Sequence, residues 1–148
     1  MEMKYNKSYG DNGKNFEEYI EYLDTIKSSI PIKLYNFVSN SSRHDLGSES
    51  LHDSRIEKIQ FINEFENSKS NMVITLLGEN RKFVLQYFNV CKYKIEQEYR
   101  INDLLTYEIG LEKIFEDDEI KLVFRADFDD GEIEIFCKEI GIEEILDY

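Results

Sequence analysis

The segment Leu51-His52-Asp53-Ser54-Arg55-Ile56 separates two unlike parts of the chain. A polar, serine-rich stretch precedes it, and a series of apolar segments follows it almost to the C-terminus. Two signals conflict at this point. Ser54 with Glu57 is typical of a helix start, whereas the next residues alternate between apolar and polar, as in a strand that is buried on one side. Because this region is rich in β-branched and aromatic residues, we predict a strand over residues 51–62.

The apolar segments that follow predict further strands. Residues 72–77 are almost entirely apolar, which indicates a central strand that is covered on both sides. Residues 122–128 alternate cleanly, as in a half-buried strand. The pair Asp130-Gly131 predicts a two-residue hairpin, because both residue types tolerate the positive φ angles of a type I′ turn. The other predicted strands cover residues 81–93, 104–114 and 132–140, and residues 142–146 form either a short strand or a turn.

The region before residue 51 predicts one clear helix. Its apolar residues recur at steps of three and four and therefore share one face. They are Phe16, Tyr19, Ile20, Leu23 and Ile26. Asn15 can cap this helix, and Pro31 follows its end. Residues 32–38 fit either a short helix or an extended segment, and we favour the helix. The polar residues 1–14 and 39–50 predict a loose arm and an exposed loop.

These elements predict an α+β fold in a single domain that spans residues 1–148. Sequential strands joined by short turns favour a curved, mostly antiparallel β meander of about five to six strands. The N-terminal amphipathic helix should pack on one face of that meander.

The order of these elements resembles a family of uncharacterised bacterial proteins that is frequent in low-GC Gram-positive organisms. That family has a motif of the form Leu-His-Asp-Ala/Ser-x-Ile/Val ahead of a β meander, and residues 51–56 match it. Looser similarity extends through residues 73–77, 103–109 and 132–135. The resemblance supports a strand after the motif, and it implies no particular activity.

The charge of the chain is unevenly distributed. The net charge is −13, and residues 101–148 hold 16 acidic and four basic side chains, which is −12 of that total. A negative field of this size repels phosphate groups, so nucleic acids and anionic membranes are poor candidate partners. Cys91 and Cys137 lie in apolar stretches, which favours reduced thiols. Because no apolar signal-peptide core is present near the N-terminus, we expect a cytoplasmic protein.

Two His-Asp pairs, His44-Asp45 and His52-Asp53, are the main candidates for chemistry. Imidazole and carboxylate groups are metal ligands, so the two pairs could converge on one divalent ion in a metal-dependent hydrolase. The alternative is structural, since histidine and aspartate at the start of a strand commonly bind nearby backbone groups. We favour the structural interpretation for His52 and Asp53, and no cofactor is expected.

The acidic C-terminal third predicts an interaction surface. Glu132 and Glu134 should share one face of a strand, and Asp127 and Asp129 should share a face of its partner. Carboxylates grouped on a rigid sheet can bind lysine and arginine of a basic protein. The sequence therefore favours a non-catalytic binding protein, such as an immunity- or inhibitor-type protein. A protein that holds a small apolar ligand between helix and strands is a further alternative.

Overall fold

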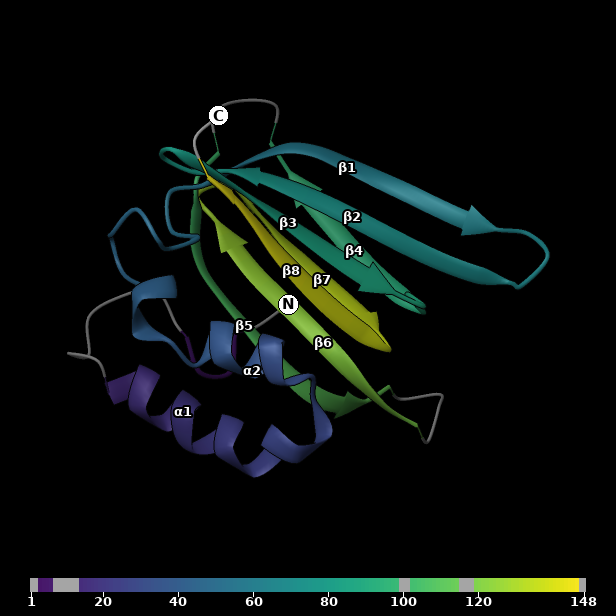
Figure 1. Cartoon of the computed structure of the whole chain (residues 1–148), viewed down its shortest axis with the longest axis horizontal. Helices are drawn as coiled ribbons and strands as arrows, with labels where there is room; N and C mark the ends of the chain where they lie inside the picture. The colour runs from purple at the N-terminus through teal and green to yellow at the C-terminus, as the bar shows by residue number, and fades with distance from the viewer. Residues whose placement is uncertain (1–2, 7–13, 99–101, 115–118, 147–148) are drawn as a thin grey trace.

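The computed structural model describes residues 3–6, 14–98, 102–114 and 119–146. In these residues the chain forms two α-helices and eight strands (Figure 1). The helices are α1 (Lys14–Ile26) and α2 (Ile32–Val38), and each is followed by a short 3₁₀ helix, η1 (Lys27–Ser29) and η2 (Ser41–Arg43). The strands are β1 (Arg55–Glu64), β2 (Lys69–Leu77), β3 (Arg81–Phe88), β4 (Lys92–Gln97), β5 (Leu104–Lys113), β6 (Ile120–Phe128), β7 (Gly131–Cys137) and β8 (Glu139–Leu146).

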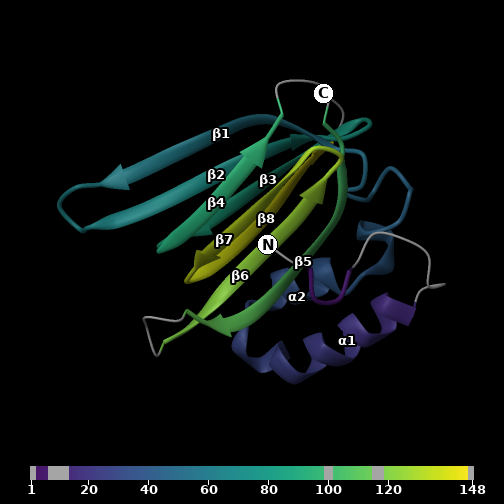
Figure 2. The ribbon, with the colours of Figure 1, turned by 180° about the vertical axis from the view of Figure 1, so that it is seen from behind.

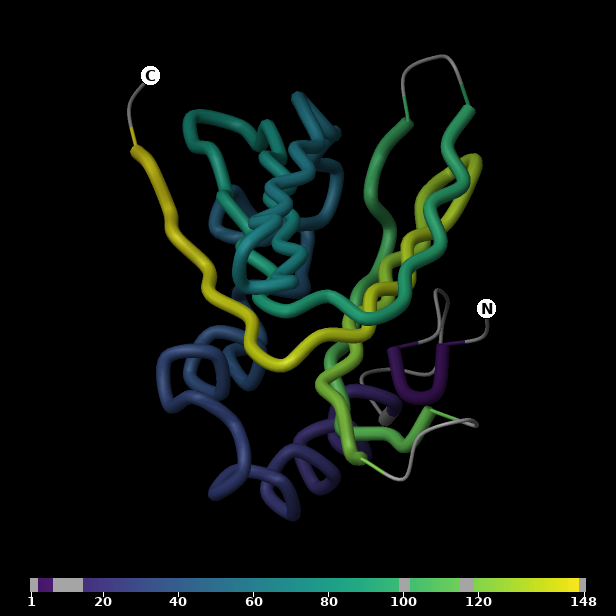
Figure 3. Tube along the Cα trace, turned by 90° about the vertical axis from the view of Figure 1, so that its right-hand side faces the viewer, coloured from purple at the N-terminus to yellow at the C-terminus, as the bar shows by residue number. Residues whose placement is uncertain are grey.

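The strands form two antiparallel sheets of four, in the orders β1-β2-β3-β8 and β4-β7-β6-β5. A single two-stranded ribbon connects them, because β3 leads into β4 and β7 leads into β8. Figure 3 shows β7 and β8 as two arms that meet at a bend. The bend is held by backbone hydrogen bonds from Lys138 to Phe88 (2.9 Å) and from Cys91 to Phe136 (3.0 Å). At this point Asn89 adopts a φ of 53°.

One core joins both sheets and both helices. Tyr87 of β3 and Phe124 of β6 meet edge to face, with ring centroids 5.5 Å apart, so the inner faces of the two sheets contact each other. The helices lie together on one side of the sheets, as both ribbon views show (Figures 1 and 2). Tyr19 and Leu23 are the fully buried residues of the amphipathic helix α1. The predicted apolar face of this helix is confirmed.

The α+β class and the antiparallel pairing are confirmed, but the predicted number of strands is too low. The segment predicted as one strand over residues 81–93 forms two strands, β3 and β4, with the bend at residues 89–91 between them. The segment over residues 132–140 likewise divides into β7 and the start of β8. The strand predicted over residues 51–62 begins only at Arg55. The helix favoured over residues 32–38 is confirmed as α2.

Several smaller predictions need correction. The helix α1 already includes Lys14, so Asn15 lies in its first turn and is not the N-cap. In the hairpin between β6 and β7, Phe128 pairs with Gly131, and only Gly131 has a positive φ, of 130°. The turn residues are therefore Asp129 and Asp130. The N-terminal arm is not loose at residues 3–6, because Met3 and Asn6 are buried. Residues 1–2 and 7–13 of the arm lie outside the described part of the chain, and of Lys14 only the backbone is described.

Candidate functional site

The Leu-His-Asp-Ser motif forms the turn that enters β1. Leu51 is fully buried, and its carbonyl oxygen accepts a hydrogen bond of 2.6 Å from the Ser54 hydroxyl. The backbone N–H of Asp53 donates to the Leu104 carbonyl (2.8 Å), and the N–H of Leu104 donates to the Ser54 carbonyl (2.9 Å). Asp53 adopts a φ of 65°, in the left-handed region that aspartate tolerates better than most residues. The motif therefore ties the start of β1 to the start of β5 in the other sheet.

His52 and Asp53 interact with each other and with the local backbone. The His52 N–H donates to the Ser50 hydroxyl at 2.9 Å, and His52 Nδ1 lies 3.1 Å from Asp53 Oδ1. The Nδ1–Oδ1 contact is close enough for an ion pair, but its geometry is not that of a hydrogen bond. We therefore interpret both residues as parts of the turn.

The other pair separates in space. His44 is packed in an aromatic cluster, where its ring stacks on Tyr107 of β5 with centroids 4.3 Å apart. Its Nε2 lies 2.7 Å from the Val38 carbonyl oxygen, so this nitrogen carries the proton. Burial lowers the pKa of His44 to about 4, and the ring is neutral at pH 7. Asp45 instead accepts a hydrogen bond of 2.8 Å from the Gly47 N–H within its own loop.

The alternative of a metal site is not supported by the described residues. His44 is not part of an exposed loop, and its ring nitrogen is engaged by backbone. Within residues 3–6, 14–98, 102–114 and 119–146, no group of three or more His, Cys, Asp or Glu side chains is placed to hold a metal ion. His44, Asp45, His52 and Asp53 thus do not converge as a ligand set.

Of the predicted acidic residues, Asp127, Glu132 and Glu134 lie on the outer face of the sheet β4-β7-β6-β5, whereas Asp129 lies in the β6–β7 turn and not on the strand. On this outer face the strand register places side chains in cross-strand rows. Glu96 pairs with Glu132, and Glu132 pairs with Asp127, so that one row carries three neighbouring carboxylates. Directly paired residues on one face of an antiparallel sheet have their Cβ atoms about 5 Å apart. We call Glu96, Glu132 and Asp127 the acidic row.

The electrostatics of the acidic row follow from this spacing. Lys94 Nζ lies 3.2 Å from Glu132 and 3.4 Å from Glu96, and their negative charges raise the pKa of Lys94. Partial burial, with the charge of Glu132 beside it, raises the pKa of Asp127. Lys94 therefore compensates Glu132 and Glu96 in part, and Asp127 is the member of the row whose negative charge burial and Glu132 disfavour.

Glu134 behaves differently from the other predicted residues. It belongs to the next row, where Arg125 Nε donates to it at 2.8 Å. Arg125 also donates from Nη2 to Glu112 at 2.8 Å, which lowers the pKa of Glu112. The Arg125 side chain is only 8 % exposed. Glu134 is thus neutralised within the chain, and it is not part of an open acidic surface.

The acidic row continues into an open hollow at the end of the sheet. This hollow has a volume of about 510 Å³ and lies between the end of β4 and the β6–β7 turn; it is lined by Ile95, Glu96, Gln97, Glu98, Asp130 and Gly131. Asp129 is exposed on the same turn. We define Glu96, Glu98, Asp127, Asp129 and Asp130 together as the acidic end of the molecule.

Sequence reasoning missed Glu96 and Glu98. Both residues precede residue 101, in the part of the chain whose positive and negative charges nearly cancel. The excess of acidic residues over residues 101–148 therefore did not point to them. A signal was present for Glu96, because residues 92–96 alternate between polar and apolar side chains as strands do. Their proximity to Asp127 comes from the pairing of β4 with β7, which joins residues far apart in the chain.

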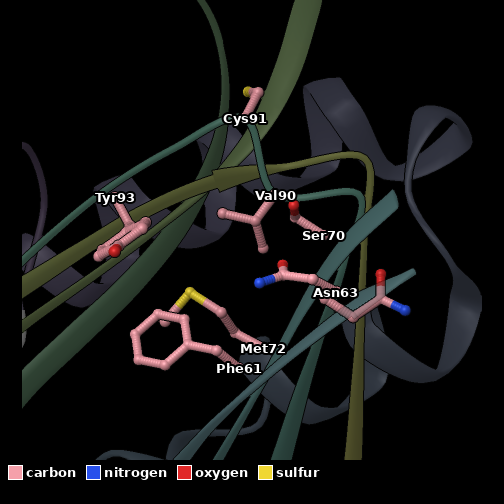
Figure 4. A pocket seen from close by; sticks show the side chains of 8 residues that line it. Phe61, Asn63, Ser70, Met72, Val90, Cys91 and Tyr93 are labelled. Atoms are coloured by element: carbon pink, nitrogen blue, oxygen red, sulfur yellow. The ribbon is translucent and has the colours of Figure 1, made fainter. Parts of the chain in front are cut away.

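A second, more apolar groove lies between the β1–β2 hairpin and β4. Its volume is about 330 Å³, and Figure 4 shows residues from β1, β2 and β4 around it. Phe61 pairs across the sheet with Met72, and its ring centroid lies 5.4 Å from that of Tyr93 on β4. Phe61 and Tyr93 are each about half exposed, at 51 % and 52 %. The space between helix and sheet, where an apolar ligand was the alternative, is instead filled by buried side chains such as Tyr19 and Leu23.

Among the described residues, no helix has the length and apolar character that crossing a membrane requires. No protein-family model and no curated protein sequence matches the chain.

Proposed function

We propose that this chain is a non-catalytic binding protein whose acidic end takes lysine and arginine side chains of a basic protein partner, in the manner of an inhibitor or immunity protein. The observation that carries the proposal is the acidic row, in which Glu96, Glu132 and Asp127 lie side by side on one face of a rigid sheet. Lys94 already lies beside Glu132 and Glu96, so a cation of the partner binds on the Asp127 side of the row, where it relieves the repulsion between Asp127 and Glu132.

The backbone around the acidic end supports this proposal, because it is held in place before any partner binds. Asn102 Nδ2 donates to the Asp130 carbonyl (2.7 Å) and to Gln97 Oε1 (2.8 Å), and the Asp130 N–H donates to Asn102 Oδ1 (2.8 Å). At Gly131 a Cβ atom would lie 2.0 Å from the Glu96 carbonyl oxygen, so the two backbones are in direct contact. A site whose backbone is already ordered loses less conformational entropy when a partner binds.

The distribution of the remaining acidic residues narrows the proposed surface. Glu134 and Glu112 are satisfied by Arg125, and Glu144 of β8 lies 2.7 Å from Arg43. Much of the negative charge of residues 101–148 is therefore compensated inside the chain. This favours the acidic end over the whole acidic sheet as the contact surface.

The test is a comparison of two charge-matched variants. The first carries Glu96→Gln, Asp127→Asn and Asp129→Asn at the acidic end. The second carries Glu17→Gln, Glu18→Gln and Glu21→Gln on the exposed face of α1, which removes the same charge elsewhere. An arginine- and lysine-rich peptide serves as the probe, and its affinity is measured by titration across salt concentrations.

The proposal expects the first variant to bind the peptide at least about tenfold more weakly and with a smaller salt dependence, while the second stays close to the wild type. Amide chemical shifts should change at residues 94–98 and 127–132. Equal weakening in both variants would show that only net charge matters, and it would reject the acidic end as a site.

A further inference from the structure

The outer edge of β1 is open. This strand is the first of its sheet, and β2 is its paired neighbour. In the described part of the chain, no hydrogen bond from outside the sheet reaches the backbone of residues 58–64. The β1–β2 hairpin projects beyond the other strands, and both ribbon views show no helix or strand alongside this part of β1 (Figures 1 and 2). Such an edge presents unpaired N–H and C=O groups that can pair with another strand.

Three exposed apolar side chains lie on this edge or just beyond it. Phe61 and Ile62 are 51 % and 46 % exposed, and Phe65 just beyond the strand is fully exposed. The only register irregularity between β1 and β2 lies between Ile56 and Lys58, so the stretch over residues 58–64 pairs regularly with β2. A regular edge strand with exposed apolar side chains is rarely left open in a monomer, because it invites pairing.

The charges of β1 indicate what pairs with it. If two copies of β1 run antiparallel with the two Phe61 residues facing each other, Lys58 of one copy faces Glu64 of the other, and the same pair recurs on the opposite side of the two-fold axis. In this register Gln60 faces Ile62, and Ile59 faces Asn63. With the centre at Gln60, Lys58 faces Ile62 and Glu64 faces Ile56. With the centre at Ile62, Glu64 faces Gln60, and Lys58 faces Glu66, which lies beyond the end of the strand. Of these three registers, the one centred on Phe61 is therefore the one that pairs Lys58 with Glu64 within the strand.

We propose that β1 pairs with β1 of a second copy of this chain, antiparallel and centred on Phe61, and joins two four-stranded sheets into one continuous sheet. The pairing is isologous, as closed two-fold dimers require. It places the two Phe61 rings next to each other and brings the mouth of each apolar groove, with Tyr93 at its rim, under the second copy. The groove of about 330 Å³ beside Phe61 thus becomes part of the dimer interface.

The decisive test uses charge reversal at the two ends of the pairing. Lys58→Glu alone and Glu64→Lys alone each turn both attractive pairs into repulsive ones. Both variants should be monomeric, with dimerisation at least about tenfold weaker than in the wild type by sedimentation analysis. An equimolar mixture of the two variants restores Glu–Lys pairs on both sides, and it should form a heterodimer.

The mixture also guards against misfolding, since two misfolded chains would not recover a defined dimer. A second measurement fixes the register: in a chain with Cys91→Ser, Phe61→Cys should form an intermolecular disulfide under mild oxidation, whereas Ile59→Cys should do so much more slowly. A wild-type protein that stays monomeric up to its solubility limit would overturn the proposal. So would a dimer that both charge reversals leave intact.

Discussion

The two edge strands β5 and β1 differ in how their backbones are covered. Along β5, Tyr19 and Tyr22 of α1 place their hydroxyl oxygens 2.8 Å from the N–H groups of Ile109 and Leu111. Along residues 58–64 of β1, no comparable side chain is present among the described residues. A helix therefore closes one edge with side-chain hydrogen bonds, and the other edge keeps the hydrogen-bonding capacity that a second strand needs.

The closed edge has a further layer. His44 stacks on Tyr107 of β5, and its ring lies edge-on to Tyr19 at 6.0 Å. On the outer face, Glu108 is buried and accepts hydrogen bonds from the N–H groups of Lys4 (2.7 Å) and Tyr5 (3.2 Å). Helix, loop and N-terminal arm thus all converge on β5. The contacts of β5 therefore contribute to the stability of the fold, whereas the open edge of β1 is where we propose that two copies of the chain pair.

The largest expected effect concerns pH at the closed edge. The pKa of His44 is about 4 in the folded chain, below the ordinary value of 6.5. Between pH 4 and 6.5 the imidazole of the unfolded chain binds a proton that the folded chain does not bind. The free energy of unfolding is therefore highest above pH 6.5, and it decreases as the pH falls toward 4. The loss amounts to about 3 kcal/mol.

Urea unfolding at a series of pH values checks this, with His44→Phe as the matched variant. In the variant, the free energy of unfolding should change less with pH between 6.5 and 4, because no histidine is protonated at this position on unfolding. Glu112 and Glu132, whose pKa values are lowered, still destabilise both proteins at more acidic pH. The same slope between pH 6.5 and 4 in both proteins would contradict a buried neutral His44.

The next effect comes from the tyrosine hydroxyls. Tyr19→Phe keeps the ring but leaves the buried N–H of Ile109 without its acceptor, so the free energy of unfolding should fall by about 1–3 kcal/mol. Tyr22→Phe should cost less, because Tyr22 is only partly buried and water can replace its hydroxyl. Thermal or urea unfolding measures both. Equal, negligible losses would mean that α1 closes β5 by packing alone.

The smallest effect is expected at the open edge. Ile62→Thr keeps a β-branched side chain on an exposed strand position, and it should change the stability of the folded monomer by no more than about 0.5 kcal/mol. The measurement is urea unfolding at a concentration where the chain is monomeric. A loss as large as that from Tyr19→Phe would show that β1 contributes to the core, and the contrast between the two edges would fail.

The sequence predicted elements whose pattern is local. The apolar face of α1 depends on neighbouring residues only, and it is found in the structure. Residues 122–128 form a strand as predicted, but it is not half-buried, because Val123 and Arg125 on its other face are buried too. The division of residues 81–93 was not predictable in this way. Both halves alternate like one strand, and the bend at Asn89 depends on pairing with β7 and β8, which lie some 50 residues further along the chain.

The same limit applies to the candidate site. Alternation correctly predicted that Glu132 and Glu134 share one face of β7. The prediction that Asp127 and Asp129 share a face of the partner strand is wrong, because β6 ends at Phe128 and Asp129 lies in the turn. Alternation could not show that Arg125 neutralises Glu134, or that Glu96 joins the row from another strand. His44 was expected in an exposed loop because its neighbours are polar, yet rings from α1 and β5 surround it. Those rings come from distant segments, which no local pattern reveals.

The bend in the β3–β4 and β7–β8 ribbon also fixes which way the side chains of β4 point. Phe88 pairs with Glu139 and Lys92 with Phe136, so one strand takes four steps where the other takes three. This extra residue determines which side chains of β4 face the interior and which face solvent. Deleting Val90 alone would rotate β4 by half a repeat, turn Ile95 toward solvent and drive Glu96 into the apolar interior. The structure therefore constrains the number of residues at this bend more tightly than it constrains their identity.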